Sequence, residues 1–392
     1  MSIYRRYGVK PLINAAGTKT RLGGALMSPE VLQAMTDAAA EAVDMAELQA
    51  AASKVIAGIT GAQAGCVTSG AAAGLTLGAA ACMTGLDPAK IDRLPNNHDL
   101  PHEIIIFRSH RNSYDHAWRA AGAKLIEVGL DDRAAGSGVR TLETWEIEAA
   151  INERTVAVAY VANRRNEPNL ARLSEYCHSR NLPVLVDAAG QLPPAENLQA
   201  FIDSGADLVA FSGGKAIGGP QATGILCGKK ELIQAALLNS LDMDMDLELW
   251  DPPPSLLPPE SIEALPRHGI GRGFKVSKEN IIGLLVALER FASGEWQREL
   301  EARREIAGSI ARSVDETTAI SAEYSETSGH PTVSLTFSTT TEARRVYQEL
   351  LRGEPGIALD PADIYDGVLI VNTATLLPEH ARVIAARLEA VT

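Results

Sequence analysis

Basic charge, paired cysteines and long apolar runs are all scarce in this chain of 392 residues. The formal net charge is −13, whereas binding to nucleic acid or to an anionic membrane depends on clustered Lys and Arg. No window reaches the roughly 18 uninterrupted apolar residues that a membrane helix needs. We therefore expect a cytoplasmic protein with no membrane and no nucleic-acid partner.

The cysteines and histidines give no sign of a disulfide framework or a metal site. The cysteines lack Cys-x-x-Cys spacing and lie in or beside apolar stretches, as reduced core thiols do. They are Cys66, Cys82, Cys177 and Cys227. His98 and His102 have a metal-like spacing, but Pro101 breaks the helix that would bring both to one face, so we expect no metal.

Along the first 240 residues, short apolar runs alternate with amphipathic stretches of helical periodicity. Short apolar runs such as 103–107, 155–162 and 184–187 predict strands, and the amphipathic stretch 170–180 is typical of the helices between them. Continuous apolar strands between amphipathic helices indicate an α/β fold, with a mostly parallel sheet covered by helices on both faces. Functional groups in such sheets gather at the carboxyl ends of the strands.

The composition changes after residue 240. Residues 241–246 alternate apolar residues with aspartates, and we interpret them as a solvated lid or a subunit contact. The proline-rich run 251–259 excludes a central strand or a regular helix, and an α+β pattern follows it. We predict an N-terminal arm and helix over 1–50, a large domain over 51–265 and a small C-terminal α+β domain over 266–392.

Lys215 is the most informative residue, because it follows an apolar run at 207–211 and lies between two glycine pairs. A lysine is normally a solvated surface group, and formation of a Schiff base explains this unusual place. Asp187 ends another very apolar run, where an unpaired carboxylate needs a cation or takes up a proton. A pyridinium nitrogen is such a cation, and an aspartate that merely caps the next loop is the alternative.

Two further strand ends carry candidate groups. Ser69, Gly70 and Ala71 join a strand end to a helix start, where free N–H groups and the helix dipole can hold a phosphate. A simple helix N-cap is the alternative. His110 follows the run 103–107 and is our candidate for a ring that stacks on the cofactor, with a hydrogen-bonded loop histidine as the alternative.

Taken in chain order, these parts resemble the fold-type I family of enzymes that depend on pyridoxal 5'-phosphate (PLP). The order is a phosphate turn, a stacking residue, an aspartate and Ser212-x-x-Lys215, and the spacing from Asp187 to Lys215 looks like that family's. The resemblance is closest to the bacterial selenocysteine synthase-like branch and covers nearly the whole chain. The matching segments are 13–24, the turn at Ser69, 186–191, 212–221 and 271–279.

The resemblance implies roles for the matching residues. Lys215 would bind the cofactor as a Schiff base and act as general base, Asp187 would hold the pyridine nitrogen, and His110 is counted with them as catalytic. The cofactor-binding set is Ser69, Gly70, Ala71, His110, Asn163, Asp187, Ser212, Lys215 and Arg272. The substrate-binding set is Asn14, Thr20, Arg21, Gln191 and Arg272. A packed N-terminal turn is the alternative for the first three of these, and a surface charge is the alternative for Arg272.

The resemblance also narrows the reaction. Selenocysteine synthases bind a transfer RNA and typically carry an additional N-terminal domain, whereas this chain begins near the core and is acidic, so we expect no selenium transfer as its main activity. Shorter relatives resemble ammonia lyases of amino sugar acids such as D-glucosaminate or its 6-phosphate. We expect a PLP-dependent lyase that converts an amino sugar acid or a β-hydroxy amino acid to a 2-keto acid and ammonia. Such enzymes are homodimers or higher homo-oligomers.

Several alternatives stay open at this point. Racemase, aldolase or selenium transferase chemistry would use the same cofactor, and a non-catalytic protein could keep the fold. Arg21, Arg165 and Arg272 are suited to hold a carboxylate or polyhydroxy acid. Loss of the substrate hydroxyl could be assisted by Gln191, Thr20 or His110, and no pattern in the sequence chooses among them.

Overall fold

The chain forms two compact units, one made of residues 1–26 and 290–392 and the other of residues 27–289. The units thus meet after residues 26 and 289, whereas the predicted boundaries lie at residues 50 and 265. The computed structural model describes residues 2–133, 136, 138–140, 143–163, 168–242, 244–258, 262, 264–318, 320–326 and 329–392.

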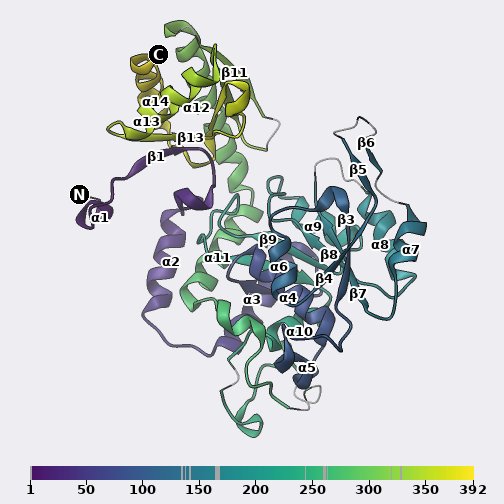
Figure 1. Ribbon diagram of the computed structural model, residues 1–392. Coiled ribbons are helices and arrows are strands. Elements are labelled where there is room, and N and C mark those ends of the chain that lie inside the picture. The colour runs from purple at the N-terminus through teal and green to yellow at the C-terminus, as the bar shows by residue number, and fades with distance from the viewer. Residues whose placement is uncertain are drawn as a thin grey trace. The chain divides into compact units, whose positions relative to one another are not determined.

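The unit 27–289 is built on a seven-stranded sheet with helices on both faces (Figure 1). Its strands are β2 (Ala64–Thr68), β3 (Glu103–Phe107), β4 (Lys124–Val128), β7 (Thr155–Val161), β8 (Val184–Asp187), β9 (Leu208–Ser212) and β10 (Gly224–Gly228). They lie in the order β2-β10-β9-β8-β7-β3-β4. Strand β10 is antiparallel to both neighbours, and the other paired strands are parallel. The predicted α/β fold is confirmed.

The helices of this unit follow the strands in alternation. They are α2 (Pro29–Ala39), α3 (Met45–Thr60), α4 (Ala71–Thr84), α5 (Pro88–Arg93), α6 (Asp115–Ala120), α7 (Thr144–Ala150), α8 (Leu170–His178), α9 (Asn197–Asp203), α10 (Lys230–Leu238) and α11 (Lys278–Ala292), the last of which ends in the other unit. Helix α4 is buried over most of its length because its small residues let it approach the sheet. A Cβ at Gly78 would lie 3.3 Å from Leu208 Cδ1. A short hairpin, β5 (Leu130–Asp132) with β6 (Gly138–Arg140), extends from the unit.

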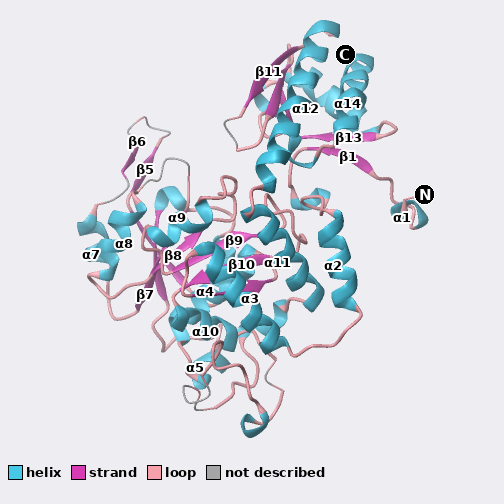
Figure 2. Cartoon of the chain, turned by 180° about the vertical axis from the view of Figure 1, so that it is seen from behind, coloured by secondary structure: helices cyan, strands magenta, loops and turns pink. Residues whose placement is uncertain are grey.

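The unit of residues 1–26 and 290–392 has its own sheets and core (Figure 2). Strand β1 (Leu12–Ala15) pairs in parallel with β13 (Gly356–Leu359), so the two ends of the chain share one structure. An antiparallel sheet contains β11 (Ser321–Ser325), β12 (Thr332–Thr336) and β14 (Val368–Asn372). The helices are α1 (Ile3–Arg6), α12 (Glu295–Thr317), α13 (Thr340–Arg352) and α14 (Pro378–Val391).

The four cysteines are free, in agreement with the sequence pattern. Burial raises the pKa of the thiols of Cys66, Cys177 and Cys227 to about 12, so these thiols stay protonated and unreactive at neutral pH. Within the described ranges, we find no helix with both the length and the apolar character needed to span a bilayer.

Side chains of α3 close the outer edge of β2. The Gln49 side-chain amide donates to the Val67 carbonyl at 2.9 Å and accepts from the Val67 N–H at 3.0 Å. The Ser53 hydroxyl accepts from the Gly65 N–H at 3.1 Å. An edge strand presents unpaired backbone groups that invite pairing with other chains. Here the helix takes the place of the missing neighbouring strand.

We predict that Gln49→Ala lowers the free energy of unfolding by about 2 to 3 kcal/mol, because it leaves a buried N–H and a buried C=O without partners. Urea unfolding would measure this change. Gln33→Ala, at an exposed position of α2, is the matched control and should cost less than about 0.5 kcal/mol. Equal losses in the two variants would contradict the role given to Gln49.

Candidate active site

Five predicted side chains lie at the carboxyl ends of strands in the unit 27–289. Asp187 ends β8 and Ser212 ends β9, while Ser69, His110 and Asn163 follow β2, β3 and β7. These strands run in the same direction, so their carboxyl ends share one edge of the sheet. Ligand sites of open α/β sheets form at this edge.

Asp187 is a half-buried residue whose carboxylate has few groups around it that offset its negative charge. Burial raises its pKa, and the hydrogen bond from the Ala189 N–H at 3.0 Å and the positive charge of Lys215 act in the opposite direction. Burial is the largest of these effects. A further cation beside Asp187 would therefore stabilise its ionised form.

The backbone around Lys215 is held in a tight loop by close approaches that only glycine permits. The Gly213 N–H donates to the Thr223 carbonyl at 2.9 Å. A Cβ on Gly213 would lie 2.2 Å from Thr223 Oγ1, and a Cβ on Gly214 would lie 2.5 Å from Gln221 Cα. The glycines before Lys215 thus anchor the backbone from which its half-buried side chain extends.

His110 is buried in a polar and aromatic setting. Its ring lies edge-on to Tyr160 at 4.9 Å and to Phe107 at 5.3 Å between centroids. The Val161 N–H donates to Nδ1 at 3.2 Å, so Nδ1 is an acceptor and the proton of the neutral ring is on Nε2. The Asn163 side-chain amide lies 3.4 Å from Nε2, so the structure brings these two predicted residues together.

The turn before α4 offers backbone donors rather than the serine hydroxyl. Gly70 has φ 118°, and no side chain caps the helix that starts at Ala71. The Ser69 hydroxyl donates to the Phe274 carbonyl at 2.7 Å, so its proton is already engaged. A Cβ on Gly224 would lie 2.5 Å from the Gly70 carbonyl carbon, which keeps the turn close to β10. The N-terminal N–H groups of α4 are the phosphate donors that this geometry favours.

The predicted substrate residues are divided between the two units. Gln191 donates its amide to the Ala162 carbonyl at 2.9 Å and so links the ends of β7 and β8. Asn14, Thr20 and Arg21 belong to the other unit, where the Asn14 side chain donates to the Gly17 carbonyl at 2.9 Å. This contact agrees with a packed N-terminal turn, and a substrate role for these residues stays a prediction. Arg165 lies outside the described residues.

Arg272 lines a cavity of about 490 Å³ in the unit 27–289. Its guanidinium lies 2.8 Å from the carboxylate of Asp242. Thr68 and Phe274 also line this cavity, which places it beside the Ser69 turn. Sequence reasoning missed the partnership of Arg272 with Asp242, because Asp242 lies in a loop and Arg272 in a short 3-10 helix (Ile270–Phe274), and no periodic pattern connects the two.

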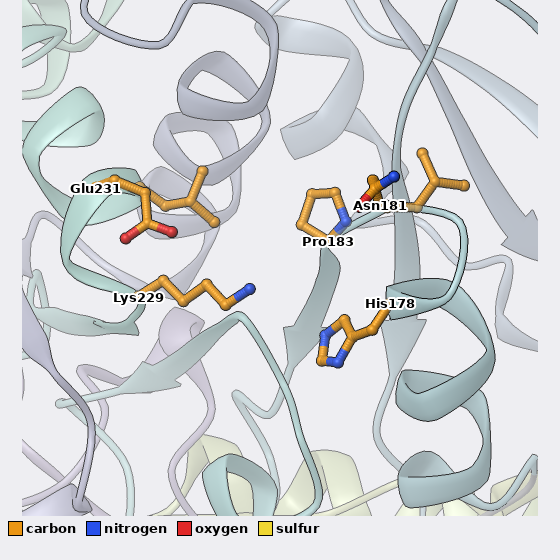
Figure 3. A pocket seen from close by; sticks show the side chains of 7 residues that line it. His178, Asn181, Pro183, Lys229 and Glu231 are labelled. Atoms are coloured by element: carbon orange, nitrogen blue, oxygen red, sulfur yellow. The ribbon is translucent and has the colours of Figure 1, made fainter.

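A second cavity, of about 300 Å³, lies at the amino ends of β8 and β9, away from these groups (Figure 3). Lys229 and His178 reach toward the same space. Both contact the fully buried carboxylate of Asp207, at 2.7 and 2.9 Å, and Asp207 accepts from the Val184 N–H at 2.6 Å. The cluster compensates a buried charge and ties two strands together, which is a structural role.

Comparison with known proteins gives matches over nearly the whole chain. A 5'-C-glycyluridine monooxygenase-decarboxylase from Streptomyces sp. is 30% identical over 98% of this chain and 91% of its own length. A D-glucosaminate-6-phosphate ammonia lyase from Salmonella typhimurium is 28% identical over 75% of this chain and 71% of its own. A solved D-glucosaminate-6-phosphate ammonia lyase superposes with a TM-score of 0.79 at 26% identity, covering 100% of this chain and 98% of that one. The model of the L-seryl-tRNA selenium transferase family, SelA, matches residues 115–246.

The chain belongs to the selenocysteine synthase-like branch of the fold-type I PLP enzymes. The resemblance inferred from the sequence motifs is thereby confirmed.

The site residues of this fold-type I enzyme fit PLP. The uncapped start of α4 suits a phosphate, and the half-buried carboxylate of Asp187, whose pKa is raised by burial, suits a cationic ring nitrogen. Lys215 is near enough for its charge to lower the pKa of Asp187.

We predict that Asp187 makes the cofactor-free protein less stable as the pH rises above about 4, the ordinary pKa of an unfolded carboxyl group. Its pKa is raised on folding, so the folded state keeps its proton to higher pH than the unfolded state. Stability from this group is therefore greatest at acidic pH and is lost as the pH rises through the folded pKa. Asp187→Asn should weaken this loss of stability. It should also lower the affinity for PLP at least about tenfold, because the protonated ring nitrogen would no longer face a negative charge.

Urea unfolding of the cofactor-free protein at pH 5 and pH 8 would measure the stability change, and titration with PLP the affinity. Asp203→Asn, at the exposed end of α9, is the control for loss of one negative charge. A wild-type protein that gains more stability than Asp187→Asn between pH 5 and pH 8 would refute the raised pKa.

Proposed function

We propose that this chain is a PLP-dependent lyase that converts a β-hydroxy-α-amino acid with a sugar-derived chain to a 2-keto acid and ammonia. The observation that carries the proposal is the meeting of Asp187, the Lys215 loop and the start of α4 at one edge of the sheet, in a chain that resembles ammonia lyases over most of its length. The substrate loses its Cα proton and its β-hydroxyl as water. Water then replaces the amino group, and ammonia leaves without net oxidation.

The geometry of the sheet edge supports the proposed binding roles. The N–H groups at the start of α4 hold the cofactor phosphate, with Ser212 at the end of β9 nearby in the same role. Asp187 holds the ring nitrogen in its protonated form. When bound, PLP supplies an electron-withdrawing ring that accepts the electrons left at Cα.

The proton transfers are assigned to two side chains. The Lys215 amine would act as general base and remove the Cα proton. His110 has Nδ1 engaged by the Val161 N–H, so its Nε2 proton is the one it can offer to the leaving hydroxyl. Gln191 already donates its amide to Ala162, which makes it the weaker candidate for this step.

The substrate class rests on what the relatives' names have in common. D-glucosaminate 6-phosphate and a glycyl group on C5' of uridine both place an amino group on Cα and a hydroxyl on the next carbon, beside a sugar-derived chain. A seryl group has the same amino and hydroxyl pattern. Arg272 suits the carboxylate or phosphate of such a substrate, because guanidinium binds these anions in a bidentate way. Arg21 is proposed for the same kind of contact.

A second candidate is oxygen-dependent decarboxylation of a related amino acid. It is favoured by the 30% identity over 98% of this chain to the monooxygenase-decarboxylase. We also propose that the enzyme is cytoplasmic and works as a homodimer or higher homo-oligomer, as is usual for fold-type I sites.

The lyase is tested by measuring ammonia and 2-keto acid from a panel of amino sugar acids, their 6-phosphates and β-hydroxy amino acids. We expect equal amounts of the two products from at least one sugar-derived substrate. Uptake of oxygen with release of carbon dioxide would favour the second candidate instead. Loss of optical activity without keto acid would indicate a racemase, and cleavage to glycine an aldolase.

Lys215→Ala should abolish this turnover and the absorbance of the bound cofactor at about 410–430 nm. Lys230→Ala, at an exposed position in the first turn of α10, is the matched control and should keep both. A wild-type protein without the absorbance band after addition of PLP would refute the cofactor assignment.

A further inference from the structure

The Arg272 guanidinium, which the proposed function assigns to an anionic group of the substrate, is paired with the carboxylate of Asp242. The two side chains lie 2.8 Å apart, and their exposed fractions are 31% for Arg272 and 56% for Asp242. The Asp244 N–H and the charges of Arg272 and His268 keep the pKa of Asp242 below its usual range, so its carboxylate is ionised. An anionic ligand of Arg272 must therefore compete with the carboxylate of Asp242.

The backbone of Arg272 is firmly anchored. The Gly271 N–H donates to the carbonyl of the fully buried Asn239 at 2.8 Å, and a Cβ on Gly269 would lie 2.3 Å from the same oxygen. On the other side of Arg272, the Phe274 carbonyl accepts from the Ser69 hydroxyl. The backbone from which the Arg272 side chain extends is therefore held on both sides.

Asp242 is held far less strongly. It begins the acidic segment 242–251, whose described residues are mostly exposed. Besides this ion pair, the Asp242 carboxylate accepts a local hydrogen bond from the Asp244 N–H at 3.1 Å. An ion pair between partly exposed side chains adds little stability. Of the two partners, Asp242 is the one that can move away.

The cavity around the pair has a surplus of positive charge. Its lining includes Arg272, Lys275 and Lys278 as cations, against Asp242 and Glu279 as carboxylates. If the carboxylate of Asp242 leaves, the site holds room and charge for a phosphate or a carboxylate. A phosphate dianion binds a guanidinium more strongly than a single carboxylate does.

We propose that Asp242 is a specificity-determining residue, whose carboxylate fills the Arg272 site until the anionic end of a substrate replaces it. This role rests on the proposed function, because it assigns to Arg272 the substrate anion. Substrates that carry a phosphate or second carboxylate displace Asp242. Substrates with a neutral chain leave the pair intact and bind without help from Arg272.

Calorimetric titration of the PLP-loaded protein with inorganic phosphate tests the proposal, since the bound cofactor already fills the phosphate turn. We expect Asp242→Asn to bind phosphate about three- to tenfold more tightly than the wild type, as loss of a competing surface ion pair implies. Asp244→Asn removes the same charge two residues away and is the matched control, with an expected change under about twofold. Arg272→Gln in the Asp242→Asn background should remove the gain.

Unchanged or weaker phosphate binding by Asp242→Asn would overturn the proposal, because Asp242 would then position Arg272 instead of competing for it. The same gain in Asp244→Asn would also overturn it, since the effect would be general electrostatics. These titrations do not depend on turnover, so a protein that yields no keto acid refutes the lyase and leaves the test of Asp242 standing. In an active lyase, Asp242→Asn should lower KM for a 6-phosphorylated amino sugar acid and leave KM for serine unchanged.

Discussion

Burial of one carboxylate at the end of a central strand is the constraint on which the site depends. Asp187 ends β8 inside the sheet, where burial raises its pKa and favours its neutral form. The nearby charge of Lys215 opposes this effect only in part. A protonated ring nitrogen placed against Asp187 would offset its charge, so the same burial that weakens the cofactor-free protein would strengthen the proposed binding of the cofactor. Under the proposed function, stability and cofactor binding would be opposed at this residue.

The surrounding structure serves to place a few groups around that carboxylate. Parallel strands bring Ser69, His110 and Asn163 to the same sheet edge, and the glycines before Lys215 allow its loop to lie against the Thr223 segment. Hydrogen bonds then restrict what each group can do, since the Ser69 proton goes to Phe274 and the His110 Nδ1 accepts from Val161. These engagements direct the proposed phosphate contact to the backbone of α4 and the proposed acid role to the His110 Nε2.

Much of the large sheet could be predicted from the sequence, because runs such as Ile104–Ile106 and Val184–Val186 are apolar at every residue and have one probable structure. Lys215 and Asp187 stood out because charged residues at such strand ends need partners. The pairing of β1 with β13 could not be predicted, since it joins two four-residue strands from opposite ends of the chain. The Arg272 contact with Asp242 was missed for a related reason, because it joins a loop to a short 3-10 helix that lies about 30 residues further along the chain. Such contacts depend on tertiary packing, so the local sequence pattern does not predict them.

The central claim is that PLP is bound covalently through Lys215 at the carboxyl edge of the sheet. Borohydride reduction of the PLP-loaded protein, followed by proteolysis and mass spectrometry, tests this claim most directly, because reduction fixes the cofactor on the lysine that carries it. The account predicts the cofactor mass on the peptide that contains Lys215, at near one label per chain, with other lysines unlabelled. A label on a different lysine, or no label after reduction, would contradict it.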